Sequence, residues 1–123
     1  MRTIYLKQTV SGYPIEVLCS CLEQGIHVLI TGGSFTHVGA VTIAEKEKLD
    51  TLRRSGHFDH VISEQTAEKL SRDLALVVTV ACGIHYDQVT KEDIEKIVET
   101  VSCMVSELEA DLQKDESPVP VGK

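Results

Sequence analysis

The fold of this chain is decided by the stretch IEVLCSCLEQGIHVLIT, residues 15–31. Residues 15–22 have the alternation of a half-buried strand. The side chains that would share one face of that strand are Ile15, Val17, Cys19 and Cys21. Glu-Gln-Gly at 23–25 is typical of a tight turn, and the nearly continuous apolar run 26–31 predicts a second strand. The stretch therefore predicts a β-hairpin.

Further strand patterns flank this hairpin. Residues 4–10 partly alternate between apolar and polar side chains, and the turn signal Ser-Gly-Tyr-Pro at 11–14 separates them from the hairpin. Residues 40–44, Ala-Val-Thr-Ile-Ala, predict another strand. A short fifth strand around residues 51–54 has the weakest pattern. The first half of the chain is therefore β.

Helical patterns dominate the second half. In residues 63–75 apolar side chains recur at helical spacing, with Ser63 as the expected N-cap. The β-branched run 76–84 predicts a central strand. Thr-Lys-Glu-Asp at 90–93 resembles a capping box, and an apolar stripe of about five turns follows over residues 94–112.

The order β-β-β-β-(β)-α-β-α predicts an α+β fold, an antiparallel sheet or sandwich packed with two helices. We expect one domain over residues 1–113, because no repeat or linker interrupts the pattern. The polar, proline-containing residues 114–123 predict a flexible C-terminal tail.

Charge and hydropathy exclude several classes of protein. The net charge is −7. Residues 91–123 contribute most of it, because they carry nine acidic and four basic side chains. No basic stripe is present, which argues against a nucleic-acid partner. No apolar run is long enough for a membrane span or a signal peptide, so we expect a cytoplasmic protein without a membrane partner. In that compartment the four cysteines are expected to be reduced thiols.

The segment TGGSFTHVG, residues 31–39, connects two predicted strands and is the first candidate site. Glycines allow close backbone approach to a ligand, and consecutive N–H groups, hydroxyls and an imidazole suit a phosphate or carboxylate. The candidate ligand-binding residues are Gly32, Gly33, Ser34, Phe35, Thr36, His37 and Gly39. The alternative is a solvated strand connection, because no P-loop or dinucleotide-binding motif is complete.

The segment RRSGHFDH, residues 53–60, holds adjacent arginines, Arg53 and Arg54. Guanidinium groups bind phosphate and carboxylate oxygens in a forked geometry. We therefore add Arg53, Arg54 and His57 to the candidate anion site. Viewed alone, the segment is better explained as a solvated loop before a helix.

A catalytic interpretation of Cys82, His85 and Asp87 is less well supported. Cys82 and His85 are three positions apart on an extended segment, so their side chains are expected on opposite faces. Neither a zinc-ligand spacing nor a nucleophile elbow occurs in the sequence. The sequence therefore predicts no catalytic and no metal site, and we expect a protein that is not an enzyme.

The chain resembles the LpdD-like family, accessory subunits found with gallate decarboxylase of the UbiD type. The resemblance rests on residues 2–5, the string 25–41 and residues 54–57, and it covers about residues 1–113. It implies a dimeric chaperone that carries reduced prenylated FMN to a UbiD-type gallate or hydroxybenzoate decarboxylase. It also implies a fold similar to that of proteasome-assembly chaperones.

The resemblance and the candidate loops are compatible. The glycine loop and the two arginines would hold the phosphate of the flavin, and Phe35, Phe58 or Tyr86 would face its ring. Two alternatives remain open: a protein-assembly chaperone that binds no flavin, and a small decarboxylase subunit whose acid or base is His37, His57 or His85. Apolar surface left exposed by so small a sheet also favours a homodimer.

Overall fold

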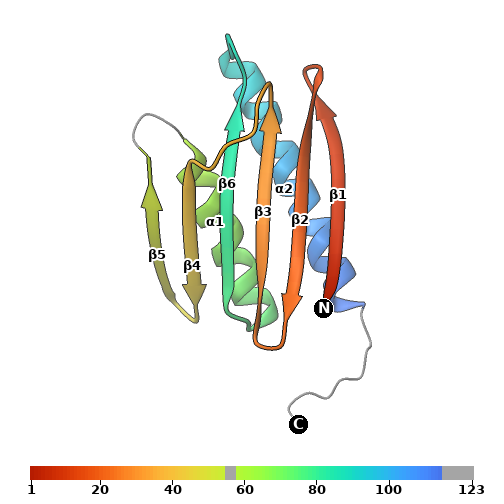
Figure 1. The fold of residues 1–123 in the computed structure, drawn as a ribbon, viewed down its shortest axis with the longest axis vertical. Helices are drawn as coiled ribbons and strands as arrows, with labels where there is room; N and C mark the ends of the chain where they lie inside the picture. Colours follow the sequence, from red (N-terminus) through yellow and green to blue (C-terminus); the bar gives the residue numbers. More distant parts are fainter. Residues whose placement is uncertain (55–57, 115–123) are drawn as a thin grey trace.

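The computed structural model describes residues 1–54 and 58–114. These residues form one mixed sheet of six strands, and two helices cover one side of the sheet (Figure 1). The elements are β1 (Arg2–Val10), β2 (Tyr13–Leu22), β3 (Gly25–Gly33), β4 (Ala40–Glu45), β5 (Lys48–Arg53), α1 (Asp59–Leu74), β6 (Val78–His85) and α2 (Lys91–Gln113). The predicted order of elements is confirmed, including the weak strand near residues 51–54, which begins earlier, at Lys48.

The strand order across the sheet is β1-β2-β3-β6-β4-β5. Consecutive strands form antiparallel hairpins, β1 with β2, β2 with β3, and β4 with β5. The α+β class is confirmed, but the sheet is mixed rather than wholly antiparallel, since β6 inserts between β3 and β4 and runs parallel to β3. The helix α1 carries the chain back across the sheet, so that β6 enters the sheet running in the same direction as β3. Parallel neighbours need such a long crossover connection.

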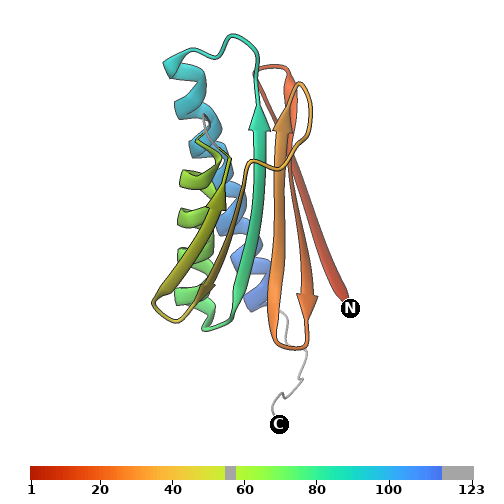
Figure 2. The same ribbon diagram turned by 60° about the vertical axis from the view of Figure 1, so that its left-hand side comes forward.

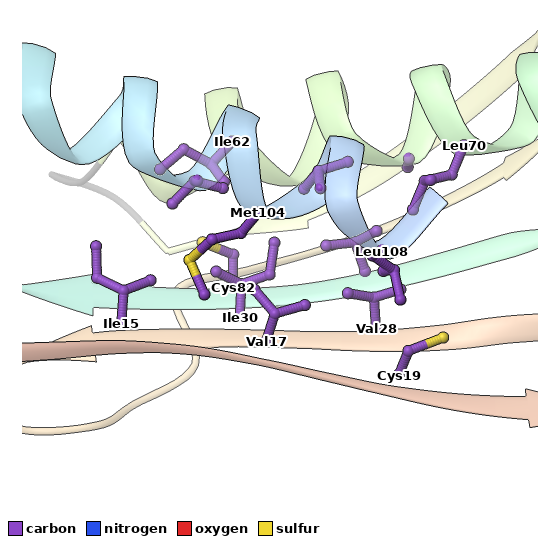
Figure 3. Close-up of a cluster of buried hydrophobic side chains, with 14 of the residues drawn as sticks. Ile15, Val17, Cys19, Val28, Ile30, Ile62, Leu70, Cys82, Met104 and Leu108 are labelled. Carbon is purple, nitrogen blue, oxygen red and sulfur yellow. The ribbon is translucent and has the colours of Figure 1, made fainter. Parts of the chain in front are cut away.

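Both helices pack on the same face of the sheet and leave the other face without a helix (Figure 2). The core lies between these two layers, and the inward side chains of β2 alternate as predicted, with Ile15, Val17 and Cys19 fully buried. Met104 and Leu108 of α2 lie over them (Figure 3). The predicted apolar stripe of the last helix is therefore the cover of the sheet.

The two helices begin differently. At α2 the predicted capping box is confirmed: the Thr90 hydroxyl accepts from the Asp93 N–H, and the Asp93 carboxylate accepts from the Thr90 N–H. The prediction that Ser63 caps the other helix is wrong, since α1 starts at Asp59 and has no side-chain cap at Phe58. Ser63 is buried inside α1, where its hydroxyl pairs with that of Thr42 at 2.7 Å.

Neither helix in the described part of the chain is long and apolar enough to span a membrane. Of the tail predicted for residues 114–123, only Lys114 belongs to the described residues, and it caps α2. The prediction for residues 115–123 falls outside them.

Candidate functional site

The two candidate segments meet at one edge of the sheet. The carboxyl ends of β3, β6 and β5 and the start of β4 all lie at this edge, since Gly33 is in register with His85, and Ala40 with both Cys82 and Arg53. The backbone N–H of Arg54 donates to the carbonyl of Gly39 at 2.8 Å. The topology therefore brings the glycine loop and the arginines together, as the sequence analysis required. His57 lies outside the described residues.

The glycine loop is the segment of residues 31–39, and its residues 34–39 cross β6 on the side of the sheet away from the helices (Figure 2). It is fixed at both ends, because the Ser34 N–H donates to the His85 carbonyl and the Gly39 N–H to the Cys82 carbonyl, each at 2.8 Å. A Cβ on Gly83 would lie 1.8 Å from the carbonyl oxygen of His37. The loop therefore rests directly on the backbone of β6, and only glycine at position 83 leaves room for it.

The glycines of the loop make the same kind of close contact with the chain itself. A Cβ on Gly33, where φ is +95°, would lie 1.8 Å from the His85 carbonyl oxygen, and one on Gly32 would meet Ile15 at 2.9 Å. A Cβ on Gly39 would lie 1.9 Å from Asp59 Oδ2. The sequence analysis predicted that these glycines let the backbone approach a ligand closely. The group that approaches these glycines is the chain's own backbone and side chains, so their role here is to shape the loop.

Asp59 is a buried carboxylate beneath the loop that the sequence analysis did not single out. It is 1% exposed, accepts from the Ile84 N–H at 2.9 Å, and its Oδ2 lies 3.2 Å from Nε2 of His37, whose side chain is 12% exposed. A buried charge is retained only when it is paired and hydrogen-bonded. The first turn of α1, the end of β6 and the glycine loop are thereby tied together through one side chain.

The exposed surface of the loop carries a small aromatic cluster. The ring of Phe35, which is 54% exposed, stacks on the imidazole of His85 with centroids 4.4 Å apart and lies 5.7 Å from that of His37. His85 is itself paired with the exposed carboxylate of Asp87, Nε2 to Oδ1 at 3.0 Å. The Phe35 ring is tilted by 39° to that of His85 and by 47° to that of His37, and its exposed face is free to stack against a planar ring.

Of the three aromatic residues considered for ring contact, only Phe35 has this exposure. Phe58 is partly buried against the core. The hydroxyl of Tyr86 donates to the Val10 carbonyl at 2.8 Å, and its ring packs edge-on against Tyr13. Tyr86 therefore anchors the turn after β1 to the end of β6.

The arginines lie beside the loop in two different settings. Nη1 of Arg53 donates to Nε2 of His60 at 2.6 Å, which ties the end of β5 to the first turn of α1. The side chain of Arg54 is exposed next to Gly39. Thr36 is exposed, and the Ser34 hydroxyl donates to the His85 carbonyl at 3.3 Å. Among the described residues of the predicted site, the exposed side chains are those of Phe35, Thr36, Arg53 and Arg54.

The thiol of Cys82 faces the core and lies 3.9 Å from Asp59 Oδ1, whereas His85 lies on the opposite face, as predicted. Burial, and then the charge of Asp59, raise the pKa of the Cys82 thiol far above its ordinary value. A thiol held in this way is a poor nucleophile. Within residues 1–54 and 58–114, no group of three or more His, Cys, Asp and Glu side chains is arranged to hold a metal ion.

Cys19 and Cys21 both lie on the helix-covered side of β2, as alternation predicted, and both are free thiols. Burial and the neighbouring Cys21 raise the pKa of the Cys19 thiol to about 12. Both factors keep Cys19 protonated and unreactive at neutral pH.

Comparison with known proteins agrees with the fold and the sequence resemblance. The chain is 31% identical over 90 residues to Protein LpdD of Lactiplantibacillus plantarum, an alignment that spans 68% of this chain and 66% of that protein's length. Its fold is similar to a solved structure described as a novel chaperone complex for yeast 20S proteasome assembly, with a TM-score of 0.57 at 10% identity over 85% of this chain and 99% of that one. Residues 9–113 match the family model of the prenylated flavin chaperone LpdD-like domain, and the chain belongs to that family.

Proposed function

We propose that this protein is a non-enzymatic carrier that binds reduced prenylated FMN at the glycine-loop edge of the sheet and delivers it to a UbiD-type decarboxylase acting on gallate or a hydroxybenzoate. The observation that carries the proposal is the exposed Phe35–His85 stack, centroids 4.4 Å apart, in a chain of the prenylated flavin chaperone family. We include homodimer formation and a cytoplasmic location, where the four free thiols remain reduced.

The residues at this edge fit the two chemically distinct ends of the ligand. The Phe35 ring offers an apolar face to the isoalloxazine, and the imidazoles of His85 and His37 border it. Arg54 lies at the end of β5, two strand spacings from β6, which is about 10 Å. That separation is comparable with the length of a ribityl phosphate, and a guanidinium is a strong partner for the phosphate.

The arrangement suits a carrier better than a catalyst. The Cys82 thiol is buried and protonated, and the His37 imidazole is engaged by Asp59 beneath the loop. The Phe35 surface is open, so a bound flavin keeps a path of exit to a client enzyme. We therefore assign the family's flavin chemistry to the client and the binding and release steps to this protein.

Anaerobic titration of the pure protein with reduced prenylated FMN tests the proposal. We expect saturable binding, and at least tenfold weaker binding for Phe35→Ala and for Arg54→Ala. Phe35→Tyr keeps the ring, and Arg72→Ala removes an exposed arginine remote from the site on α1, so both should bind like wild type. A wild-type protein that binds no flavin would reject the proposal in favour of an assembly chaperone acting on the decarboxylase alone.

Delivery is tested by reconstitution with the apo-decarboxylase. We expect the loaded carrier to activate the enzyme at substoichiometric amounts and to become dispensable once the decarboxylase holds its cofactor. A requirement for equimolar protein throughout turnover would instead identify a subunit of the decarboxylase itself.

A further inference from the structure

The two helices leave an open groove between them. It consists of two hollows with volumes of about 480 and 60 Å³. Both hollows are lined by Gln65 of α1 and by Val98 and Ser102 of α2, so they are adjoining parts of one groove. We call it the helix groove.

The helix groove has an apolar centre and a polar rim. Its aliphatic lining consists of Ile62, Ile94, Val98, Val101 and Val105. Ile94 and Val98 are only partly covered, so part of this apolar lining is in contact with solvent. The exposed side chains of the lining are Gln65, Glu95, Glu99, Ser102 and Cys103. Apolar surface surrounded by polar side chains is the anatomy of a protein–protein interface.

The charge at the helix groove is negative. Lys69, the basic residue of the lining, is neutralised by two carboxylates, those of Glu109 at 3.0 Å and Asp73 at 3.1 Å. Glu95 and Glu99 form no ion pair with another residue of the described part of the chain. Two exposed carboxylates therefore border the apolar lining without a positive charge to balance them.

The helix layer as a whole carries the net charge of the chain. Together α1 and α2 hold eleven acidic and four basic side chains, a net of −7, which equals the formal net charge of all 123 residues. The rest of the chain, with eight of each sign, is neutral. A field of one sign over one layer of a protein attracts a partner of the opposite sign and speeds their encounter.

The shape of the groove fits a helix. Along α2 its lining runs from Ile94 to Val105, which is about 16 Å or three helical turns. An amphipathic helix binds such a groove through apolar anchors at positions i, i+3, i+4 and i+7. A second copy of this chain would bring an equally acidic layer against Glu95 and Glu99, which costs binding energy. The charge therefore favours a different, basic partner.

We propose that the helix groove is the docking site for the client decarboxylase, which inserts an amphipathic helix with Lys or Arg side chains along the borders of its apolar face. The identity of the client rests on the proposed function, whereas the chemistry of the docking helix follows from the groove. Aliphatic anchors of that helix contact Val98 and Ile94, and its cations pair with Glu95 and Glu99.

The groove and the ligand site lie on opposite sides of the sheet but at the same end of α1. The glycine loop crosses the sheet on the side without helices (Figure 2). Asp59, in the first turn of α1, contacts His37 of that loop, and Ile62 of the groove follows only three residues later. A client docked on the helices is therefore close to the ligand and leaves the Phe35 surface open.

A matched pair of charge-reversed variants tests the electrostatic part of the proposal. Glu95→Lys with Glu99→Lys, and Glu23→Lys with Glu47→Lys, each change two exposed residues and bring the net charge from −7 to −3. The second pair lies in the turns after β2 and β4, outside the groove. By calorimetry with the flavin-free apo-decarboxylase, we expect at least tenfold weaker binding for the groove variant and near-wild-type binding for the turn variant. Equal binding by the two variants would overturn the proposal.

A second matched pair tests the apolar part without a change of charge. Ser102 lines the groove and Ser106 lies one turn further along α2 outside its lining, and both are exposed. Ser102→Tyr should fill the groove and weaken binding of the apo-decarboxylase at least tenfold, whereas Ser106→Tyr should bind like wild type. Wild-type circular dichroism spectra show that both variants are folded. Undiminished binding by Ser102→Tyr would place the client elsewhere.

Two further measurements separate this proposal from its alternatives. A change in mass by light scattering for Ser102→Tyr alone would assign the groove to a second copy and overturn client docking. In anaerobic titration we expect Ser102→Tyr to bind reduced prenylated FMN like wild type, because the ligand site is on the other side of the sheet. If wild type binds flavin but not the apo-decarboxylase, the docking site fails and flavin binding stands. If wild type docks through the groove but binds no flavin, the carrier function fails and the docking site stands.

Discussion

Replacing Gly83 with alanine should destabilise the protein by displacing the glycine loop. The new Cβ would lie 1.8 Å from the carbonyl oxygen of His37 and 2.5 Å from its carbon, so the loop backbone must retreat by more than an ångström. The loop is held by hydrogen bonds from Ser34 and Gly39 to the β6 carbonyls, each 2.8 Å long. A movement of that size breaks at least one of them.

The expected loss of stability follows from these contacts. Overpacking costs about 1–3 kcal/mol, and each lost hydrogen bond costs about 0.5–1.5 kcal/mol. Alanine also restricts the unfolded chain, which offsets about 0.4–1 kcal/mol. With one hydrogen bond lost, we therefore expect a net loss of roughly 0.5–4 kcal/mol for Gly83→Ala, to be compared with the stability of a typical domain, about 5–15 kcal/mol.

Urea unfolding followed by far-UV circular dichroism measures this loss, which corresponds to a midpoint shift of about 0.3–2 M at an m-value of about 2 kcal/mol/M. Gly12→Ala is the comparison, because φ at Gly12 is +86° and nothing lies within 4 Å of an added Cβ. It isolates the backbone cost of about 1–2 kcal/mol without any collision. A Gly83→Ala midpoint equal to wild type would refute the close packing of the loop on β6.

Three further predictions concern the helix cap and the thiols. Thr90→Ala should cost about 1 kcal/mol in urea unfolding, because the Asp93 N–H loses its partner. Hydrogen bonds from the backbone and hydroxyl of Thr90 and from Ser11 lower the pKa of Asp93. The stabilisation by the Asp93 carboxylate is therefore present above about pH 4 and is lost as pH falls through the lowered pKa. Asp93→Asn should remove this part of the pH dependence of the free energy of unfolding, measured by urea unfolding in acid. At pH 8, Ellman's reagent should react rapidly with the exposed Cys103 and not with buried Cys82 in native protein, and Cys103→Ser should abolish the rapid phase.

The elements with strong local signals were predictable from the sequence. The hairpin of residues 15–31 combines alternation with a turn, and the cap at Thr90 combines a hydroxyl with a carboxylate three residues later. The start of α1 was not predictable in this way, since Phe58 supplies no capping side chain. The pairing of β3 with β6 could not be predicted either, because periodicity indicates which side chains are buried and not which strands are adjacent.

The sequence pointed to candidate residues of the site, but not to the segments that contact them in the fold. Glycines at 32, 33 and 39 indicated a close approach, yet the approaching groups belong to β2, β6 and α1, which are distant in the sequence. Asp59 carried no local signal beyond an acidic residue in the first turn of a helix. Its buried contacts with His37 and Ile84 arise only when three remote segments meet.

The insertion of β6 between β3 and β4 has a consequence for the order of folding events. The hairpins β1–β2–β3 and β4–β5 close over short turns, whereas the β3–β6 pairing joins residues such as His27 and Thr79 that are 52 positions apart. Closing a long loop before any contact is gained is slow, and sheets with many non-local pairs fold in milliseconds to seconds. The two hairpin units are therefore expected to form first, and the pairing of β6 with them to limit the folding rate. A core substitution on β6 such as Val80→Ala should then slow folding rather than speed unfolding. Until β6 arrives, β3 and β4 both expose unpaired edges, so this step is also where the chain is most open to aggregation during synthesis.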